Sequence, residues 1–244
     1  MIDILKNGFD RLNIPYNDKQ LSQLTEYAKL LKEWNDKINL TSITEDSEIA
    51  VKHFIDSASA LTTGKVCGRV IDVGTGAGFP GLVLKIMQPD IKLTLLDSLN
   101  KRLTFLKDVT ERLGINDVEF IHSRAEDGGH KPELREGFDT AVSRAVAAMP
   151  LLSELCLGYV KKNGYFLALK GPAAEEEVLS AKRAISILGG ETEGISDVEV
   201  DGADHKIVIV KKVRHTPIKF PRKPALISKA PIETCYKMPK RPSL

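Results

Sequence analysis

The sequence predicts an α/β protein with a doubly wound, mostly parallel sheet of seven strands. After Gly64, short runs rich in β-branched and aromatic residues alternate with helical runs, and a glycine-rich stretch follows the first of these strands. The first sixty residues show no strand pattern, and their apolar residues recur every three or four positions. We therefore expect a helical cap over residues 1–60, a ligand-binding α/β domain over residues 61–214 and a basic, proline-rich tail over residues 215–244.

The cap is predicted to consist of helices. Apolar side chains at helical spacing predict an amphipathic helix over residues 18–38, with Asn17 or Asp18 as its N-cap. Residues 2–12 predict a shorter helix, and the acidic residues after Thr44 predict the start of a third.

The α/β domain is predicted from alternating patterns along the chain. Strands are expected at residues 69–73, 92–97, 118–122, 138–143 and 164–170, and helices at residues 80–87, 100–113, 149–157 and 173–188. Two further strands, at 195–200 and 205–213, are separated by Asp201-Gly202, which is a turn signal for an antiparallel hairpin.

Composition excludes several classes of protein. No apolar run approaches the roughly 18 residues of a membrane span, and the N-terminus lacks the layout of a signal peptide, so we expect a cytoplasmic protein without a membrane partner. The three cysteines are widely spaced, which favours reduced thiols. The five histidines are scattered, so no metal is predicted.

Charge is distributed unevenly along the chain. The net charge is +2, but residues 205–244 hold 11 of the 35 basic residues and one of the 33 acidic residues. The same segment contains six of the twelve prolines, which exclude a continuous helix or a central strand. We expect an extended basic tail, which either keeps the protein soluble or contacts a polyanion such as RNA.

The glycine-rich stretch VIDVGTGAGFPG, residues 70–81, fits two ligand-binding patterns. Read from Gly76 it has the G-x-G-x-x-G spacing of dinucleotide oxidoreductases. Read from Asp72 it has the D-x-G-x-G-x-G spacing associated with S-adenosylmethionine (SAM) methyltransferases. In both cases the ligand is expected at the carboxyl ends of the parallel strands, where strand order reverses.

Two details favour SAM over a dinucleotide. Gly74-Thr75 makes the loop longer than a pyrophosphate turn requires, and a carboxylate at Asp72 suits a ligand that carries an ammonium and a sulfonium group. Asp97, at the end of the next strand, is placed to accept hydrogen bonds from a ribose diol. That last feature serves NAD equally well, so it indicates an adenosine ligand without discriminating between the two.

The motifs together resemble a known family. DVGTGAGFPG, LLDSLNKRLTFL, SRAED, VSRA and ALKG, with NLTSI and HFIDS upstream, resemble the bacterial small-subunit ribosomal RNA guanine-N7 methyltransferase family, RsmG, also called glucose-inhibited division protein B. The resemblance runs from about Trp34 to Lys229. It implies a Rossmann-like, SAM-dependent (class I) methyltransferase fold, and an activity on a guanine of 16S ribosomal RNA in the 530-loop region.

The resemblance also implies site residues. The cofactor-binding set expected from the motifs and the resemblance is Asp72, Gly74, Gly76, Gly78, Phe79, Asp97, Ala125, Glu126 and Arg144. Glu126 could equally be an acid at a helix start, and Arg144 could equally form a salt bridge. The resemblance alone places Asn39, Thr41, His53 and Asp56 near the substrate cleft.

The RNA is expected to contact basic residues. The substrate is expected to be 16S ribosomal RNA or a small-subunit particle, and the protein is expected to be a monomer. The candidate residues for phosphate contacts are Arg124, Lys170, Lys211, Lys212, Arg222 and Lys223. No general base is expected, because guanine N7 carries a lone pair and no hydrogen. Two alternatives stay open: an NAD-linked oxidoreductase, for which no second domain or proton donor is visible, and a non-catalytic RNA-binding module, which would leave the glycine loop without a purpose.

Overall fold

The N-terminal part of the chain is a helical cap, as predicted. The computed structural model describes residues 1–200, 203–230 and 232. Helices α1 (Ile2–Arg11) and α2 (Asp18–Ile38) are followed by one continuous helical stretch made of α3 (Asp46–Glu48), the π-helix η1 (Ile49–Ile55), α4 (Asp56–Ala58) and the 3₁₀-helix η2 (Ser59–Thr63). Asn17 is the N-cap of α2 and forms a capping box with Gln20, which confirms the predicted start.

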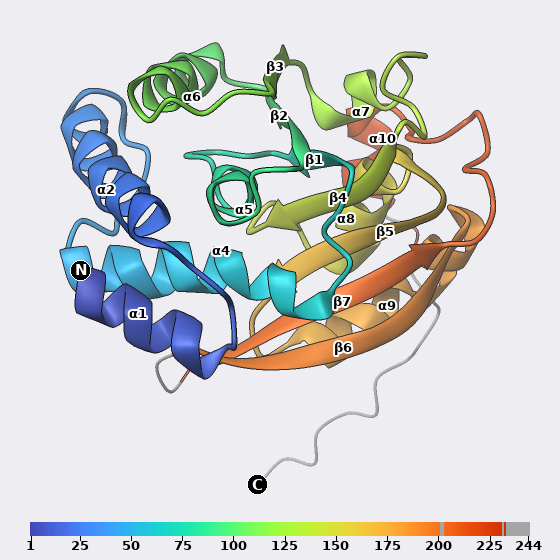
Figure 1. The fold of residues 1–244 in the computed structure, drawn as a ribbon. Helices are drawn as coiled ribbons and strands as arrows, with labels where there is room; N and C mark the ends of the chain where they lie inside the picture. The colour runs from blue at the N-terminus through green and yellow to red at the C-terminus, as the bar shows by residue number, and fades with distance from the viewer. Residues whose placement is uncertain (201–202, 231, 233–244) are drawn as a thin grey trace, which may run out of the picture.

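A seven-stranded sheet forms the centre of the molecule (Figure 1). Its strands are β1 (Arg69–Val73), β2 (Lys92–Asp97), β3 (Val118–His122), β4 (Phe138–Arg144), β5 (Val160–Lys170), β6 (Gly190–Val200) and β7 (Ala203–Lys212). The order is β3-β2-β1-β4-β5-β7-β6, and β7 is antiparallel to both of its neighbours. Strand order therefore reverses between β1 and β4, where a ligand site is expected in such a sheet.

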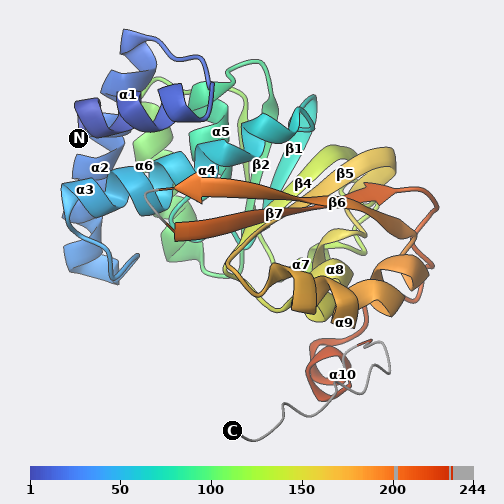
Figure 2. The ribbon, with the colours of Figure 1, turned by 90° about the horizontal axis from the view of Figure 1, so that it is seen from below.

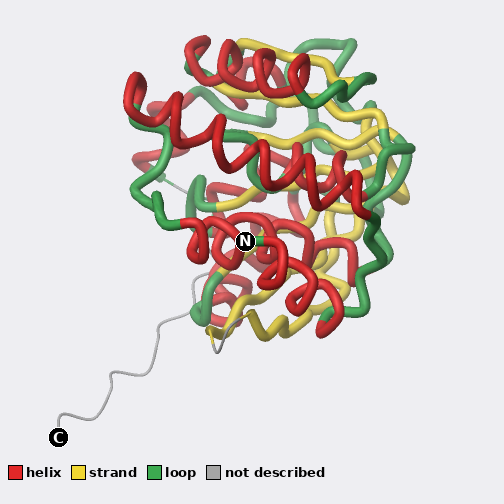
Figure 3. Tube along the Cα trace, turned by 60° about the vertical axis from the view of Figure 1, so that its left-hand side comes forward, coloured by secondary structure: helices red, strands yellow, loops and turns green. Residues whose placement is uncertain are grey.

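Helices cover both faces of the sheet (Figure 2). The cap, α5 (Gly81–Met87) and α6 (Asn100–Arg112) pack on one face in a core that includes Tyr27, Phe54 and Phe105. The other face carries α8 (Met149–Cys156) and α9 (Ala174–Ile187), with α7 (Ala125–Gly128) beside them. Figure 3 shows the cap helices in front of the strands. Because both faces are covered, the central strands β1 and β2 are almost entirely buried.

The segment after β7 differs from the predicted extended tail. Residues 213–230, which we call the strap, return along the protein and end in α10 (Pro224–Lys229), on the same side of the sheet as α7, α8 and α9. Thr216, Phe220 and Ile227 are buried in this region. Prolines prevent a long helix or central strand here, but they do not prevent packing, which is why the prediction was wrong for this part. The Asp201-Gly202 turn and the segment from Glu233 onward lie outside the described residues.

Candidate active site

A cleft of about 530 Å³ opens at the carboxyl ends of β1, β2 and β4. A ligand the size of a nucleoside fits such a volume. Eight of the predicted site residues line it: Gly74, Gly76, Phe79, Asp97, Arg124, Ala125, Glu126 and Arg144. The cap contributes Leu40, Thr41 and His53, so the cleft lies between the sheet and the cap.

The glycine loop between β1 and α5 is held in place by its own strand and the next. The amides of Gly74 and Thr75 both donate to the carbonyl of Leu96, at 2.9 and 3.1 Å. Asp72 Oδ2 accepts from the Thr75 hydroxyl at 2.7 Å and from the Gly81 amide at 2.8 Å. Asp72 is fully buried, and burial raises its pKa to about 6. It organises the loop from inside and does not line the cleft, contrary to the prediction that it contacts the ligand.

The glycines of this loop serve different purposes. Gly76 has φ +59°, and a Cβ there would meet no protein atom within 4 Å, so its missing side chain leaves room on the cleft side. Gly78 has φ +92°, and a Cβ there would overlap the Tyr27 hydroxyl, which donates to the Ala77 carbonyl. Gly78 therefore permits the cap to pack on the loop, and it is not among the residues that line the cleft.

Asp97 closes the loop onto β2. Its Oδ2 accepts from the Gly76 amide at 2.9 Å and its Oδ1 accepts from the Leu99 amide at 2.8 Å, while Arg102 lies 3.4 Å away. A carboxylate has about four acceptor positions, so with these three donors about one remains for a ligand hydroxyl. Asp97 thus fixes the loop and still faces the cleft.

The residues of the SRAED motif surround the start of α7. Arg124 is the N-cap of this short helix, and its side chain is 67% exposed. Glu126 lies in the first turn with its side chain only 12% exposed, and it lines the cleft beside Ala125. Glu126 is therefore an acid at a helix start that faces the cleft, and not an exposed one, which was the alternative considered for it.

Five polar side chains meet at the cap side of the cleft, and we call them the cleft cluster: Thr41, His53, Asp56, Arg144 and His205. Arg144 Nη1 lies 2.6 Å from Asp56 Oδ2 and donates to the Lys52 carbonyl at 2.8 Å. Asp56 Oδ1 lies 2.8 Å from His205 Nδ1. Burial alone would raise the pKa of Asp56, but the hydrogen bonds from His205 and Arg144 outweigh it, so the pKa is lowered.

His53 belongs to the π-helix η1, a rare conformation that is frequent at functional sites. Its ring stacks on Phe79 with centroids 4.4 Å apart, and the Arg144 guanidinium lies 5.1 Å from the centre of the same Phe79 ring. Burial, followed by the nearby charge of Arg144, lowers the pKa of His53 to about 4. Neutral His53 therefore joins the predicted residues Phe79 and Arg144 in one stack.

His205 was not predicted from the sequence. It reaches the cluster because β7 runs antiparallel to β5, which places its first residues at the carboxyl edge of the parallel strands, with Lys206 opposite Lys170. No local pattern marks this residue, since the strand pairing alone brings it to Asp56. Asn39, in contrast, ends α2 in the left-handed conformation at φ 50° and does not line the cleft.

Lys170 supports a loop instead of facing RNA. Its side chain is 9% exposed, and its ammonium donates to the Ala147 carbonyl at 2.6 Å and to Glu177 at 2.7 Å. Glu177 also accepts from the Met149 amide at 2.8 Å. Lys170 thereby holds the loop after β4, whose residues Ala145 and Val146 line the cleft.

The basic residues at the end of β7 lie at the opposite edge of the sheet. Lys211 pairs with Tyr165, which pairs in turn with Thr140 near the start of β4, and Lys212 pairs with Gly190 at the start of β6. Lys212 is fully buried, and its ammonium donates to the carbonyls of Leu157 and Val160. Burial lowers the pKa of Lys212, partly offset by Glu136 at 3.0 Å. These positions argue against Lys211 and Lys212 as contacts of RNA held at the cleft.

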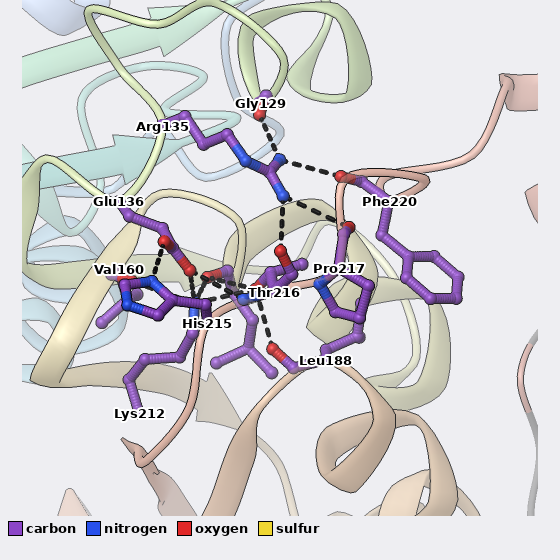
Figure 4. Close-up of polar contacts among 11 residues, drawn as sticks. Gly129, Arg135, Glu136, Val160, Leu188, Lys212, His215, Thr216, Pro217 and Phe220 are labelled. Carbon is purple, nitrogen blue, oxygen red and sulfur yellow. Dashed lines mark hydrogen bonds and ion pairs between the residues drawn. The ribbon is translucent and has the colours of Figure 1, made fainter.

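A second polar cluster, which we call the strap clasp, consists of Arg135, Glu136, Lys212 and Thr216 (Figure 4). Arg135 donates to four carbonyls, of Gly129, Phe220, Thr216 and Pro217. Glu136 accepts from the Thr216 amide at 2.7 Å and from His215 at 2.5 Å. The strap is therefore fixed by hydrogen bonds to its backbone.

Beyond the clasp the strap approaches the cleft. Arg222 forms a two-pronged pair with the buried Glu154, with contacts of 2.7 and 2.9 Å, so it too has a partner within the protein. Lys219 and Lys223 are exposed and line a groove of about 470 Å³. Glu126 lines both this groove and the cleft, which makes the two hollows neighbours.

No helix in the described part of the chain is both long and apolar enough to cross a membrane. Among the same residues, no three His, Cys, Asp or Glu side chains are grouped so that they could hold a metal ion.

Comparison with solved structures supports the fold. Over 67% of this chain, the structure is similar to TrmN from Thermus thermophilus, with a TM-score of 0.50, 19% identity and 53% of that chain covered. It is also similar to a mutant of MtNAS in complex with S-adenosylmethionine, with a TM-score of 0.52, 14% identity, and coverage of 79% and 73%. These likenesses show a shared α/β Rossmann-like fold.

Sequence comparison identifies the family. The chain is 52% identical over 234 residues to the ribosomal RNA small subunit methyltransferase G of Clostridium novyi (strain NT), covering 94% of this chain and 96% of the relative. It is 53% identical over 235 residues to that of Clostridium perfringens (strain 13 / Type A), covering 95% and 98%. Residues 20–207 match the family described as rRNA small subunit methyltransferase G. The chain therefore belongs to the rRNA small subunit methyltransferase G family.

Proposed function

We propose that this protein transfers the methyl group of SAM to N7 of a guanine in the 16S ribosomal RNA of the small subunit. The observation that carries the proposal is the opening at Gly76, where a Cβ would meet no atom and the amide is fixed by Asp97 at 2.9 Å. Family membership favours SAM over a dinucleotide as the ligand of this loop. The guanine and its N7 come from the family resemblance.

The residues of the cleft fit SAM. Gly76 leaves space for the amino-acid part, Gly74 lines the cleft beside it, and the Asp97 carboxylate can accept from a ribose hydroxyl. Ala125 and Glu126 form the wall beyond Asp97. SAM supplies a methyl group on a positively charged sulfur, which makes that carbon electrophilic. We place Asp72 and Gly78 behind this set, where they shape the loop.

The protein has to orient the target and exclude water. Guanine N7 attacks with a lone pair, so no side chain must remove a proton before transfer. The ionisable groups of the cleft cluster suit a site that orients its target and removes no proton. Arg144, Asp56 and His205 are paired with one another, and His53 is neutral at physiological pH. Rate enhancement then derives mainly from alignment of the nucleophile with the methyl carbon.

The RNA would approach from the side where Arg124, Lys219 and Lys223 are exposed. Arg124 lines the cleft, and the two lysines line the neighbouring groove. These residues replace Lys170, Lys211, Lys212 and Arg222 as the proposed phosphate contacts. We further propose that the protein acts as a monomer in the cytoplasm, on 16S ribosomal RNA or a small-subunit particle.

A transfer experiment tests this function. Purified protein is incubated with SAM labelled in its methyl group and with 16S RNA or 30S particles from cells that lack this protein. We expect label in the RNA, at a single guanine in the 530-loop region, and a cleavage pattern specific for 7-methylguanine. Label at another atom or in another molecule would contradict the proposal. Retention of NAD instead of SAM on a filter would contradict the ligand.

A further inference from the structure

We infer that the Thr41 hydroxyl acts only as a hydrogen-bond donor toward the cleft, and that it selects guanine by donating to O6 of the target base. The inference rests on the proposed function and adds to it a specificity-determining residue. Two neighbouring groups, His53 Nε2 and the Ile43 amide, contact the Thr41 hydroxyl oxygen and fill its two acceptor positions.

The groups around His53 determine which of its ring nitrogens carries the proton. Arg144 Nη2 lies 3.2 Å from His53 Nδ1, and a guanidinium can only donate, so Nδ1 must accept. Nδ1 also lies 3.2 Å from the Lys52 carbonyl, which could accept a second hydrogen bond, but a proton on Nδ1 would face the Arg144 guanidinium, which is itself a donor. The ring is neutral, so its single proton resides on Nε2.

The Thr41 hydroxyl accepts two hydrogen bonds from its neighbours. His53 Nε2 lies 2.9 Å from Thr41 Oγ1, so the ring donates and the hydroxyl oxygen accepts. The Ile43 amide also donates to the same oxygen, at 3.0 Å. A hydroxyl has two acceptor positions and one proton, so both acceptor positions are filled. Only the proton remains, and no acceptor for it occurs within the described part of the chain.

The hydroxyl is fixed in position. Asn35 Oδ1 accepts from the amides of Leu40 and Thr41, at 2.7 and 2.8 Å, which holds the backbone at the end of α2. His53 is stacked on Phe79, so the ring that donates to Thr41 cannot turn without losing that contact. Leu40, Thr41 and His53 all line the cleft. The structure therefore presents one oriented donor to a substrate at its cap side.

A hydrogen-bond donor at this position can distinguish guanine from adenine. Guanine carries its O6 acceptor beside N7 on the same edge, so a base that offers N7 to the methyl group also presents O6. Adenine has an amino group in that place, which can only donate. Because the Thr41 oxygen has no acceptor position left, it cannot pair with that amino group. A donor-only hydroxyl thus favours guanine and rejects adenine.

The first test needs neither SAM nor RNA. Nitrogen-15 NMR of the histidine rings at pH 7, with His53 assigned by comparison with a His53→Gln variant, reports which ring nitrogen carries the proton. We expect the proton on Nε2 of His53. A proton on Nδ1 would overturn the inference, because Thr41 would then donate to the ring and have no proton for the substrate.

The second test measures base selectivity. RNA containing 2-aminopurine at the target position keeps N7 and lacks O6. We expect wild-type protein to prefer guanine over 2-aminopurine in both transfer rate and binding affinity. This preference should be roughly fivefold to tenfold larger in wild-type protein than in Thr41→Val, which corresponds to the loss of one hydrogen bond. Thr41→Ser keeps the hydroxyl and should restore the preference. Thr44→Val, an exposed threonine nearby, is the matched control and should leave it unchanged.

The outcomes separate this inference from the proposed function. If wild-type protein methylates guanine N7 and Thr41→Val retains the full preference, the Thr41 assignment is wrong and the function stands. If wild-type protein transfers no methyl group to the guanine RNA, the proposed function fails and the assignment fails with it. The SAM affinity of Thr41→Val, measured alongside, should match that of Thr44→Val, whereas its melting temperature should be lower, because valine cannot accept from His53 and from the Ile43 amide.

Discussion

The cleft cluster and the strap clasp contain similar side chains but use them differently. Each combines an arginine, a glutamate or aspartate, and a histidine contact. In the clasp, Arg135 donates to four backbone carbonyls, and Lys212 is fully buried with three acceptors and an acidic partner. In the cleft cluster, the side chains of Arg144 and His205 are 15% and 26% exposed. With the tautomer that we infer for His53, the Thr41 proton has no acceptor among the described residues.

The difference indicates that the strap clasp stabilises the fold and that the cleft cluster binds a ligand. A buried polar group that lacks a partner costs free energy, so a cluster whose role is to hold the fold tends to satisfy every group. A cluster that keeps an oriented donor at the edge of a cavity can give it to a ligand. The clasp therefore predicts effects on stability, and the cleft cluster predicts effects on binding and transfer.

The largest expected effect on binding is the loss of cofactor affinity. Gly76→Val should reduce SAM affinity by about 100-fold or more, about 2.7 kcal/mol, because the new side chain projects into the ligand space. Gly114→Val is the matched control, since Gly114 has φ +61°, close to the +59° of Gly76, and also has open space at Cβ. Both variants carry the same backbone strain, so calorimetry should show loss of binding in Gly76→Val alone. Equal affinities would place the cofactor elsewhere.

The largest expected effect on stability belongs to the strap. Arg222→Ala leaves the buried carboxylate of Glu154 without its charged partner and should cost about 3–5 kcal/mol of unfolding free energy. Glu154→Gln leaves a neutral amide beside an arginine whose side chain is 23% exposed, so it should cost less, about 1–2 kcal/mol. Urea denaturation measures both. SAM affinity should stay within about twofold in the two variants; a large drop would mean that the strap belongs to the active site.

A pH effect distinguishes the two clusters further. The pKa of His53 is lowered from 6.5 to about 4, so its contribution to stability is complete above pH 6.5 and is lost as pH falls toward 4. Burial is the main cause of the lowered pKa, the charges of Arg144 and Lys52 add to it, and Asp56 opposes it. His53→Gln should therefore remove up to about 2 kcal/mol of the stability difference between pH 7.5 and pH 4.5. Identical pH profiles for the two proteins would show that folding does not lower the pKa of His53.

The sequence predicted those parts whose structure depends on local pattern. All seven strands, the capped start of α2 and the position of the glycine loop follow from periodicity and from the residues that end each element. Alternation of strands and helices is sufficient to imply a parallel sheet, and the loop after its first strand must then lie at the carboxyl edge. Family resemblance added Ala125, Glu126 and Arg144, which all line the cleft.

The parts that failed depend on contacts between distant segments. Lys170 and Lys212 look like surface lysines in the sequence, yet each has its ammonium bonded to backbone carbonyls inside the protein. Charge counts cannot distinguish such a residue from an exposed one, because the partners are 23 and 55 residues away. Asp72 is a different case: it was predicted to face the ligand, but the Thr75 hydroxyl and the Gly81 amide, both within the glycine loop and the start of α5, hold its carboxylate inside.

The smallest effect concerns Lys219 and Lys223, the exposed lysines of the strap. Replacing both with glutamine should weaken RNA binding and reduce the slope of log affinity against log salt by about 1.4 to 1.8, which is 0.7 to 0.9 for each lost phosphate contact. Lys92→Gln combined with Lys162→Gln is the matched control, because these exposed lysines lie near the starts of β2 and β5, at the edge opposite the cleft. Both double variants change the net charge equally, so general electrostatic attraction cancels in the comparison. An unchanged slope for the strap variant, with a wild-type methylation rate, would mean that the strap only stabilises the fold and that the RNA lies nearer to Arg124 and the cap.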